Sequence, residues 1–336
     1  MNWSQSYSAK WRVFRVNRKT WADGQMLAKV DSANVSRTAD GNLLESGSIE
    51  TSGEFTSDYY RIVMTAQQGG EIVRVDVATL LFEVSGGTVD YGRTVHSVDG
   101  HSVLYPASTT SVTTGEYAPA GVDGARYAGE LLQDTINAPV SVEGSFTLND
   151  HIVHELGSSV IDAVWAVLDA GNFIMQIDGY GTVHILPKPT GSALVIDNSR
   201  KRLLSNGIEF STDVSAIPNR YIVIDDDNIT IATNTDPNSE VSTVNRGYFV
   251  DAVDTSPTPI NSETYGEYAN RKLKELSLLK DTRSYAREFT PDIYPYSIIK
   301  ATIDGLYGDF RIESQTLECG KGIVVKEKAS KETQLW

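Results

Sequence analysis

The runs Tyr59-Tyr-Arg-Ile-Val-Met-Thr65 and Glu71-Ile-Val-Arg-Val-Asp-Val77 flank Gln67-Gln-Gly-Gly70, and this stretch decides the fold class. In the second run, apolar valines alternate strictly with the charged residues Arg74 and Asp76, and this period of two is that of a β-strand. The paired glycines between the runs are a turn signal. The stretch therefore predicts two β-strands joined by a turn.

The residues before this stretch have the same character. Trp11-Arg-Val-Phe-Arg-Val16 alternates large and basic residues, Asp23-Gly24 is a turn signal, and Ser48 to Phe55 predicts another strand. Several short strands at this spacing are typical of a sandwich or a barrel. We therefore predict a first β domain at residues 1–85.

Residues 86–205 predict a mixed α/β domain. A helix follows Gly124 and is stopped by Pro139. Its apolar face is formed by Ala128, Leu131, Leu132, Thr135 and Ile136. A second helix follows Gly157-Ser-Ser159, where either serine can cap it, with Asp162 in its first turn and Gly171 placed as a C-terminal cap. A hairpin over residues 172–186, turning at Gly179-Tyr-Gly181, follows.

Residues 206–336 predict a second β domain with one helix near 264–280. Arg220–Asp225 and Asn228–Thr233 flank Asp226-Asp227 as a hairpin, and Thr264-x-x-Glu267 is a capping box that starts the helix. Three strands end the chain, at 297–303, 309–318 and 322–328, with Asp304–Gly308 predicted as the first connecting loop.

The composition excludes some classes of protein. With 336 residues, 40% hydrophobic and 22% charged, the chain is a folded globular protein of about two domains' worth. Its most apolar stretch, Val160 to Ala170, is too short to cross a bilayer and carries Asp162 and Asp169. Residues 1–18 lack the apolar core of a secretory signal, so we expect a chain made and kept in a cytoplasm until something releases it.

The net charge of −15 is unevenly distributed. Residues 1–30 carry +5, residues 31–264 carry −21 and residues 265–336 carry +1. This balance argues against a tight nucleic-acid binder, because such affinity comes from neutralising phosphates. An acidic wall that DNA passes without sticking is compatible with the same numbers, and so is solubility alone.

The histidines give a weak indication of a metal site. His151 and His154, followed by Glu155, are spaced as a ligand pair on a helix, but no third ligand is indicated and the segment also fits a strand or loop. A solvated hairpin explains His96 and His101, and His184 fits a packed or edge position in a strand.

Other candidate residues have structural explanations. Cys319 fits a strand end and, as the only cysteine, excludes an intrachain disulfide and a cysteine zinc site. Asp225-Asp-Asp-Asn228 lacks the ligand positions of a calcium loop and favours a turn. Gly157-Ser-Ser159 could present amides to an anion, but a serine cap accounts for it. We therefore predict no catalytic, cofactor-binding or metal residues.

Several stretches resemble the hub proteins of phage tails and related contractile particles. The middle of the chain resembles this family at Pro119–Gly124, Tyr127–Leu132, Ala138–Val140, Gly157–Trp165, Gln176–Gly181 and Ile185–Pro189. The end resembles its closing β-barrel at Pro291–Pro295, Leu306–Ile312 and Ser314-Gln315. The resemblance covers residues from about 30 to the C-terminus.

The resemblance implies a mainly β fold with an α+β insertion, in which two tail-tube-like β-barrels accompany a smaller mixed α/β domain. It implies a non-enzymatic hub of the virion tail, assembled in the host cytoplasm without a cofactor. Three copies would adapt a six-fold tail tube to a three-fold tip and line a channel through which DNA passes without specific binding.

The implied partners are two further copies of the chain, a tail-tube or distal tail protein ring, and a tail-tip spike, fibre or tape-measure protein, with no membrane insertion. Many tail-tip relatives continue into a peptidase or fibre after the last strand, whereas this chain stops at Trp336, which counts against a lytic role. Two alternatives remain: a glycan- or peptidoglycan-cleaving tail enzyme, and a carbohydrate-binding module, which 16 tyrosines and five tryptophans permit.

Overall fold

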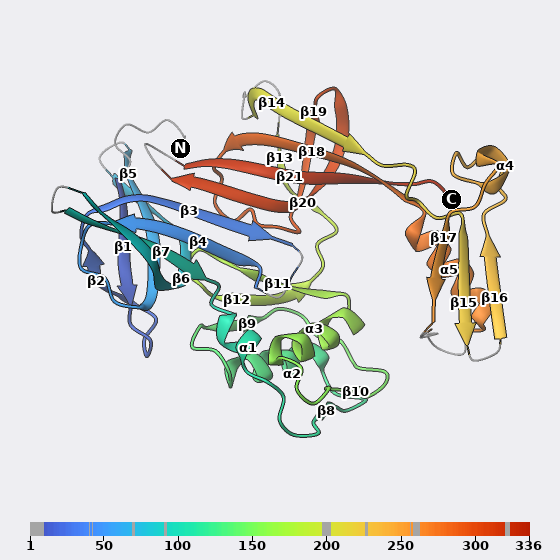
Figure 1. Cartoon of the computed structure of the whole chain (residues 1–336), viewed down its shortest axis with the longest axis horizontal. Coiled ribbons are helices and arrows are strands. Elements are labelled where there is room, and N and C mark those ends of the chain that lie inside the picture. The colour runs from blue at the N-terminus through green and yellow to red at the C-terminus, as the bar shows by residue number, and fades with distance from the viewer. Residues whose placement is uncertain are drawn as a thin grey trace. The chain divides into compact units, whose positions relative to one another are not determined.

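The computed structural model describes residues 10–39, 41, 43–68, 71–90, 93–196, 203–225, 228–255, 257, 263–319 and 323–336 (Figure 1). The chain divides into two units. Unit 1 comprises Met1–Gly207 and Tyr285–Lys328, and unit 2 comprises Ile208–Ser284 and Ala329–Trp336. The fold is mainly β with a few helices, as the sequence predicts.

Among the described residues, thirteen strands form one sheet. Its path runs β14-β18-β21-β20-β3-β4-β7-β6-β5-β1-β2, with β19 paired to β20 and β13 paired to β19. The strands are β1 (Lys10–Val16), β2 (Asp23–Leu27), β3 (Val30–Thr38), β4 (Glu45–Thr51), β5 (Asp58–Gln68), β6 (Glu71–Asp90), β7 (Arg93–His101), β13 (Ser192–Val195), β14 (Leu203–Thr212), β18 (Leu278–Glu288), β19 (Ile298–Ile303), β20 (Leu306–Cys319) and β21 (Ile323–Gln334).

The two ends of the sequence meet in unit 1. β20 pairs antiparallel with β3, with Leu317 opposite Val35. One buried cluster accordingly draws Val35, Ile62 and Leu80 from the first hundred residues and Leu317 and Val325 from the last forty. The predicted boundaries at residues 85 and 205 and the two units therefore divide the chain differently.

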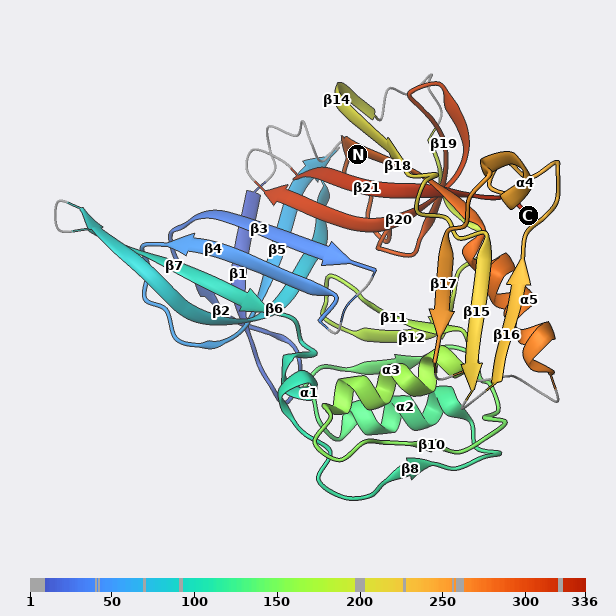
Figure 2. The same ribbon diagram turned by 45° about the vertical axis from the view of Figure 1, so that its right-hand side comes forward.

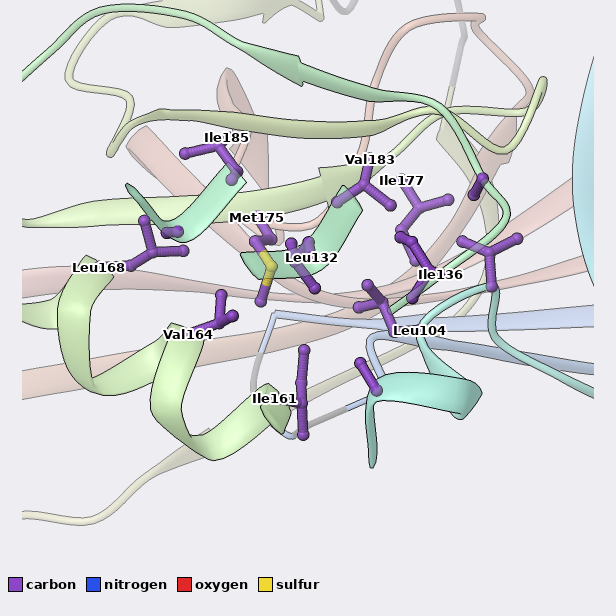
Figure 3. Packing of buried hydrophobic residues seen from close by; sticks show 14 of the residues in the cluster. Leu104, Leu132, Ile136, Ile161, Val164, Leu168, Met175, Ile177, Val183 and Ile185 are labelled. Atoms are coloured by element: carbon purple, nitrogen blue, oxygen red, sulfur yellow. The ribbon is translucent and has the colours of Figure 1, made fainter. Parts of the chain in front are cut away.

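The mixed α/β segment of unit 1 packs helices on a small sheet. Among its described residues, α2 and α3 lie side by side against strands in the order β11-β12-β9 (Figure 1). Its elements are α1 (Tyr105–Thr109), β8 (Tyr117–Ala118), α2 (Gly124–Gln133), β9 (Val140–Val142), β10 (Ile152–Val153), α3 (Val160–Ala170), β11 (Phe173–Ile177) and β12 (Val183–Pro187). Figure 3 shows their shared core, where Leu132, Ile161 and Val164 point toward Met175 and Ile185.

The helix termini of this segment follow the sequence closely. Ser159 and Asp162 form a reciprocal capping box at the start of α3, and Gly171 is its C-cap. Asp123 caps α2, which ends at Gln133, earlier than the predicted stop at Pro139. Beyond Gln133 the Thr135 amide donates to the Leu132 carbonyl (2.9 Å), only three residues back, so the last turn tightens and the α-helix ends.

Unit 2 contains a three-stranded sheet in the order β16-β15-β17, with helix α5 on one face (Figure 2). Its elements are β15 (Arg220–Asp225), β16 (Asn228–Thr233), α4 (Thr243–Arg246), β17 (Asp251–Asp254) and α5 (Tyr265–Leu276). Thr264 and Glu267 form the predicted capping box of α5. Asp225 pairs with Asn228 as predicted, and residues 226–227 lie outside the described residues.

Of three turns predicted from the sequence, one lies earlier in the chain, one lies partly outside the described residues and one is shorter than predicted. Asp23-Gly24 begins β2, and the turn precedes it, closed by hydrogen bonds between Asn17 and Trp21 (2.7 Å) and between Asn17 and Ala22 (2.9 Å), because the Asn17 side chain supplies a local acceptor. Gln67 and Gln68 still pair with β6, and Gly69-Gly70 lie outside the described residues.

The third turn is shorter than the predicted loop Asp304–Gly308. Only Asp304 and Gly305 connect β19 to β20, since Ile303 already pairs with Leu306. Both connecting residues have positive φ angles, 51° and 78°. This geometry matches the right-handed twist of the two strands that a two-residue hairpin joins. Among the described residues, no helix has the length and apolar character to cross a bilayer.

Candidate functional site

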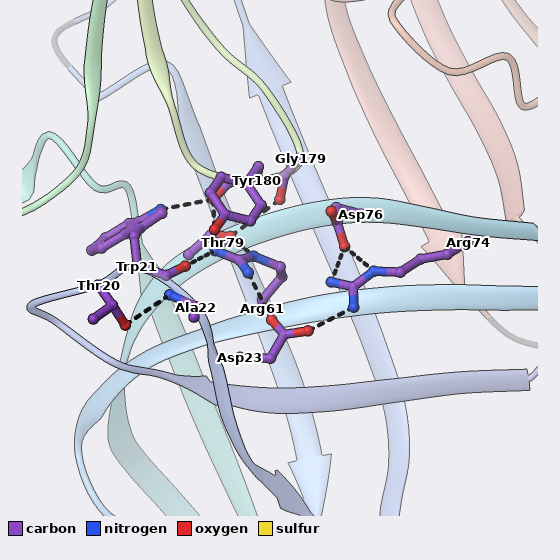
Figure 4. Close-up of polar contacts among 10 residues, drawn as sticks. All are labelled: Thr20, Trp21, Ala22, Asp23, Arg61, Arg74, Asp76, Thr79, Gly179 and Tyr180. Atoms are coloured by element: carbon purple, nitrogen blue, oxygen red, sulfur yellow. Dashed lines mark hydrogen bonds and ion pairs between the residues drawn. The ribbon is translucent and has the colours of Figure 1, made fainter.

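The turn Asp178-Gly-Tyr-Gly181 joins β11 to β12 and lies directly on the main sheet (Figure 4). A Cβ on Gly179 would sit 1.7 Å from the carbonyl oxygen of Asp76 in β6, so only glycine allows this approach. Gly181 has a φ of +85°, which glycine adopts without strain. The turn predicted from sequence is thus the contact point of the mixed segment with β6.

Arg61 in β5 holds this turn in place. Its guanidinium donates to the Tyr180 carbonyl (3.1 Å), to the Trp21 carbonyl (2.9 Å) and to the Thr79 hydroxyl (3.1 Å), and lies 3.6 Å from the centre of the Tyr180 ring. Its charge is balanced by Asp23, 2.6 Å away. Arg61 is fully buried, so each of these partners offsets the cost of removing the cation from water.

Neighbouring groups extend this polar network. Asp23 also binds Arg74 (2.6 Å), and Arg74 binds Asp76 (2.5 Å). The Trp21 indole donates to the Tyr180 carbonyl (2.8 Å), and the Thr79 hydroxyl donates to the Gly179 carbonyl (3.1 Å). Figure 4 shows these groups arranged around the turn, which rigidly fixes it against β5 and β6.

A groove of about 700 Å³ opens beside this network in unit 1. One wall is Val73–Val77 of β6, another is Asp178–Tyr180, and a third is the loop Glu288–Tyr294 that follows β18. Arg37, Arg74 and Asp76 contribute charge to its lining. Mixed charges of this kind suit a polar protein segment better than an apolar small molecule.

A buried ion pair underlies the groove. Arg37 Nε lies 2.8 Å from Glu45 Oε1, its guanidinium also donates to the Val77 carbonyl, and it lies 4.9 Å from the centre of the Tyr294 ring. Burial raises the pKa of Glu45 to about 7, because it outweighs the opposing pull of Arg37. Among the described residues, Glu45 Oε2 has no hydrogen-bond partner.

His184 bridges two carboxylates at the base of the same turn. Its Nε2 lies 3.1 Å from Asp178 and its Nδ1 lies 3.3 Å from Glu143. The hydrogen bond with Asp178 raises the pKa of His184 against the effect of burial, and Glu143 adds to the rise. Burial opposes ionisation of Asp178, but the bonds from His184 and the Thr182 amide lower the pKa of this carboxyl.

The other histidines do not come together. His154 is buried and shares a 3.0 Å hydrogen bond with the Tyr127 hydroxyl, and burial lowers its pKa. The His151 ring meets the Tyr117 ring edge to face, and the short strand β10 separates His151 from His154 in the sequence. His101 stacks on Tyr105. In the part of the chain that the structure describes, no three His, Cys, Asp or Glu residues are placed to hold a metal ion.

The remaining candidate residues occupy structural positions. Cys319 is buried at the end of β20, and burial raises its pKa to about 12, which keeps the thiol protonated. The Ser159 hydroxyl accepts from the Asp162 amide, so this helix start is capped by its own side chain.

Sequence reasoning missed a second buried network in unit 1. Arg287 in β18 binds Glu327 in β21 with two hydrogen bonds of 2.8 and 2.6 Å, and both side chains are fully buried. The Gln315 amide donates to Glu327 (2.6 Å) and to the Ile293 carbonyl (3.1 Å), which lies in the loop of the groove. The sequence carried no signal for this network, because charged residues also alternate on solvated strands.

No protein-family model and no curated protein matches this sequence. Solved structures do match it. The tail protein from Neisseria meningitidis MC58 superposes with a TM-score of 0.68 at 14% identity, covering 97% of each chain. The 43 kDa tail protein of prophage MuSo2 from Shewanella oneidensis gives 0.67 at 10% identity, covering 96% of this chain and 98% of its own.

The prophage tail protein gp18 from Listeria monocytogenes EGD-e is also similar, with a TM-score of 0.52 at 12% identity over 96% of this chain and 94% of its own. The fold of this chain is therefore the fold of phage-type tail proteins. The resemblance predicted from the sequence is confirmed at the level of the fold.

Proposed function

We propose that this chain is a non-catalytic structural subunit of a phage-type tail, placed at the baseplate or tail tip of the virion. One observation carries the proposal: the tail proteins of Neisseria meningitidis and Shewanella oneidensis share its architecture over nearly their whole lengths. A match of this extent includes both units of the chain.

The finer proposal is a homotrimeric hub. In it, three copies carry two tail-tube-like barrels each and adapt a six-fold tube to a three-fold tip. Part of the −21 charge of residues 31–264 faces the lumen, where it repels phosphate and keeps DNA mobile. The proposed partners are the tube or distal tail ring on one side and a spike, fibre or tape-measure protein on the other.

The buried polar network around Arg61 supports a structural role. A subunit that transmits contacts along a tail must hold its segments in a fixed arrangement, and the buried bonds from Arg61 to Asp23 and Tyr180 do so within unit 1. The groove beside it is lined by charged side chains set among apolar ones, which suits a protein segment.

Sedimentation and negative-stain imaging of the purified chain test this function. The expected result is a three-fold ring with a lumen wide enough for duplex DNA, which binds purified tail tubes. A protein that remains monomeric at high concentration and fails to bind tubes would overturn the hub. Turnover of peptidoglycan or capsule by the purified chain would overturn the non-catalytic part separately.

A further inference from the structure

Strand β6 has one free edge beside the groove of unit 1. It pairs with β5 along Glu71–Phe82, but β7 pairs with it only from Leu81 onward. Among the described residues, no strand therefore lies along the second edge of residues 71–80. A free strand edge presents backbone amides and carbonyls that can pair with another chain.

The chain itself covers only part of this edge. The β11–β12 turn packs on the carbonyl of Asp76, and Arg37 donates to the carbonyl of Val77. Another wall of the groove is the loop Glu288–Tyr294, which we call the groove loop. Within the described part of the chain, no hydrogen bond joins this loop to the backbone of Val73–Val75. We call these three residues of β6 the open edge.

The charged side chains beside the open edge do not block it. Natural proteins commonly protect a free edge with charged residues. Here Arg74 lies 2.6 Å from Asp23 of β2 and also binds Asp76, so its side chain is drawn across β5 and away from the edge (Figure 4). Val73 and Val75 point to the opposite face of β6, where they pack against a buried cluster.

The groove loop is held as firmly as the strand. Phe289 and Ile293 are buried, and Phe289 belongs to the same cluster as the one on which Val73 and Val75 pack. The Gln315 amide donates to the Ile293 carbonyl (3.1 Å). Because both walls are anchored in the core of unit 1, the groove is formed before anything binds in it, which lowers the entropic cost of binding.

The charges of the groove favour a basic occupant. Its lining contains two arginines, Arg37 and Arg74, and four carboxylates. Both arginines already bind carboxylates within the chain. Asp292 of the groove loop is exposed and, in the part of the chain that the structure describes, forms no ion pair. A cationic side chain in the groove would complement this carboxylate.

We propose that the open edge binds an extended segment of a partner protein as an added β-strand, with a basic side chain of that segment at Asp292. The free backbone of β6 supplies the hydrogen bonds, and Val73 and Val75 contact alternate side chains of the added strand. The inference rests on the proposed structural function, because it names how this chain would hold another protein of the tail. It does not depend on trimer formation.

The first experiment tests recognition of the backbone. The probe is a positional-scanning library of labelled, acetylated hexapeptides, with binding to the purified chain measured by fluorescence anisotropy. Binding peptides are expected to alternate apolar with polar residues and to carry Lys or Arg. N-methylation of their backbone amides should weaken binding about tenfold, because hydrogen bonds to β6 are lost. No binding by any peptide of the library, or binding that resists N-methylation, would overturn the added strand.

The second experiment tests the basic side chain. Asp292→Asn should weaken binding of the selected peptides about threefold, as expected for an exposed ion pair. The matched control is Asp304→Asn, which should leave binding unchanged. Both aspartates are exposed and have positive φ angles, 63° and 51°, a conformation that asparagine also adopts. Equal effects of the two substitutions would overturn the contact with Asp292.

The third experiment distinguishes a partner protein from a second copy of this chain. Sedimentation velocity of the unaltered chain is measured with and without a saturating concentration of the selected peptide. An assembly that stays intact with the peptide bound supports a segment from another protein. Dissociation by the peptide would overturn that assignment, because the open edge would then be occupied by a second copy. A chain that binds the peptide but never self-associates would overturn the proposed hub alone.

Discussion

Gly179 packs directly against the backbone of Asp76, which occupies the space that a side chain at position 179 would need. The Cβ of an alanine at 179 would lie 1.7 Å from the Asp76 carbonyl oxygen. The turn between β11 and β12 therefore tolerates no side chain at this position, and the attachment of the mixed segment to β6 depends on it.

Gly179→Ala should destabilise unit 1 by about 3 kcal/mol, since the turn must move off β6 and strain the bonds to Arg61. Urea unfolding monitored by tryptophan fluorescence measures the change, because Trp21 donates to the Tyr180 carbonyl. The control is Gly191→Ala, where a Cβ would have nothing within 4 Å, and it should change stability by less than about 0.5 kcal/mol. Equal effects of the two substitutions would contradict the close contact.

Arg61→Met should cost about 3 kcal/mol, because it leaves Asp23 and the Tyr180 carbonyl without their buried partner. Arg126→Met serves as the control, since Arg126 makes a solvent-exposed helical pair with Glu130, which contributes little to stability. Chemical denaturation of both variants gives the comparison. A loss at Arg61 no larger than that at Arg126 would show that the network contributes little.

Glu45→Gln should remove a pH dependence of stability. The folded-state pKa of Glu45, about 7, lies above its ordinary value of 4.5, so between these values the folded chain retains a proton that the unfolded chain has released. The free energy of unfolding attributable to this group therefore falls as the pH rises across that window. Denaturation at a series of pH values should show a flatter profile for Glu45→Gln than for Glu130→Gln, which removes an exposed carboxylate.

His184→Gln should also alter the pH dependence of stability, at higher pH than Glu45→Gln does. The pKa of His184 is raised by Asp178 and Glu143, so its stabilising contribution is complete below the ordinary value of about 6.5 and is lost as the pH rises through the folded value. Proton NMR titration of the imidazole gives the shift directly. A His184 that titrates below the ordinary value would contradict the bridge to the two carboxylates.

Cys319 should resist thiol reagents while the chain is folded. Burial raises its pKa to about 12, so almost no thiolate is present near neutral pH. Labelling with iodoacetamide should be slow in native buffer and rapid in concentrated urea. Rapid labelling of the native protein would place the thiol at the surface.

The sequence predicted features that depend on neighbouring residues. The capping boxes at Ser159 and Thr264 were predictable, since their partners Asp162 and Glu267 lie three positions away. The alternating strands were predictable for the same reason. Local spacing encodes these elements, and the structure contains them.

The polar network around Arg61 in unit 1 was not predictable, because its residues are distant in the sequence. Arg61 reaches Asp23 and Tyr180 only after β2, β5 and the β11–β12 turn have come together. The glycine at 179 was predicted for a turn, but its close approach to Asp76 depends on packing.

The buried pair of Arg287 and Glu327 has a consequence for folding fidelity. The pair joins adjacent strands, β18 and β21, and both side chains lie out of contact with water. Sliding one strand by a single residue would turn one partner to the opposite face and abandon the other charge in the core. The ion pair therefore specifies the register of β18 and β21. Its loss in a misaligned pairing costs more free energy than its presence contributes to the correct one.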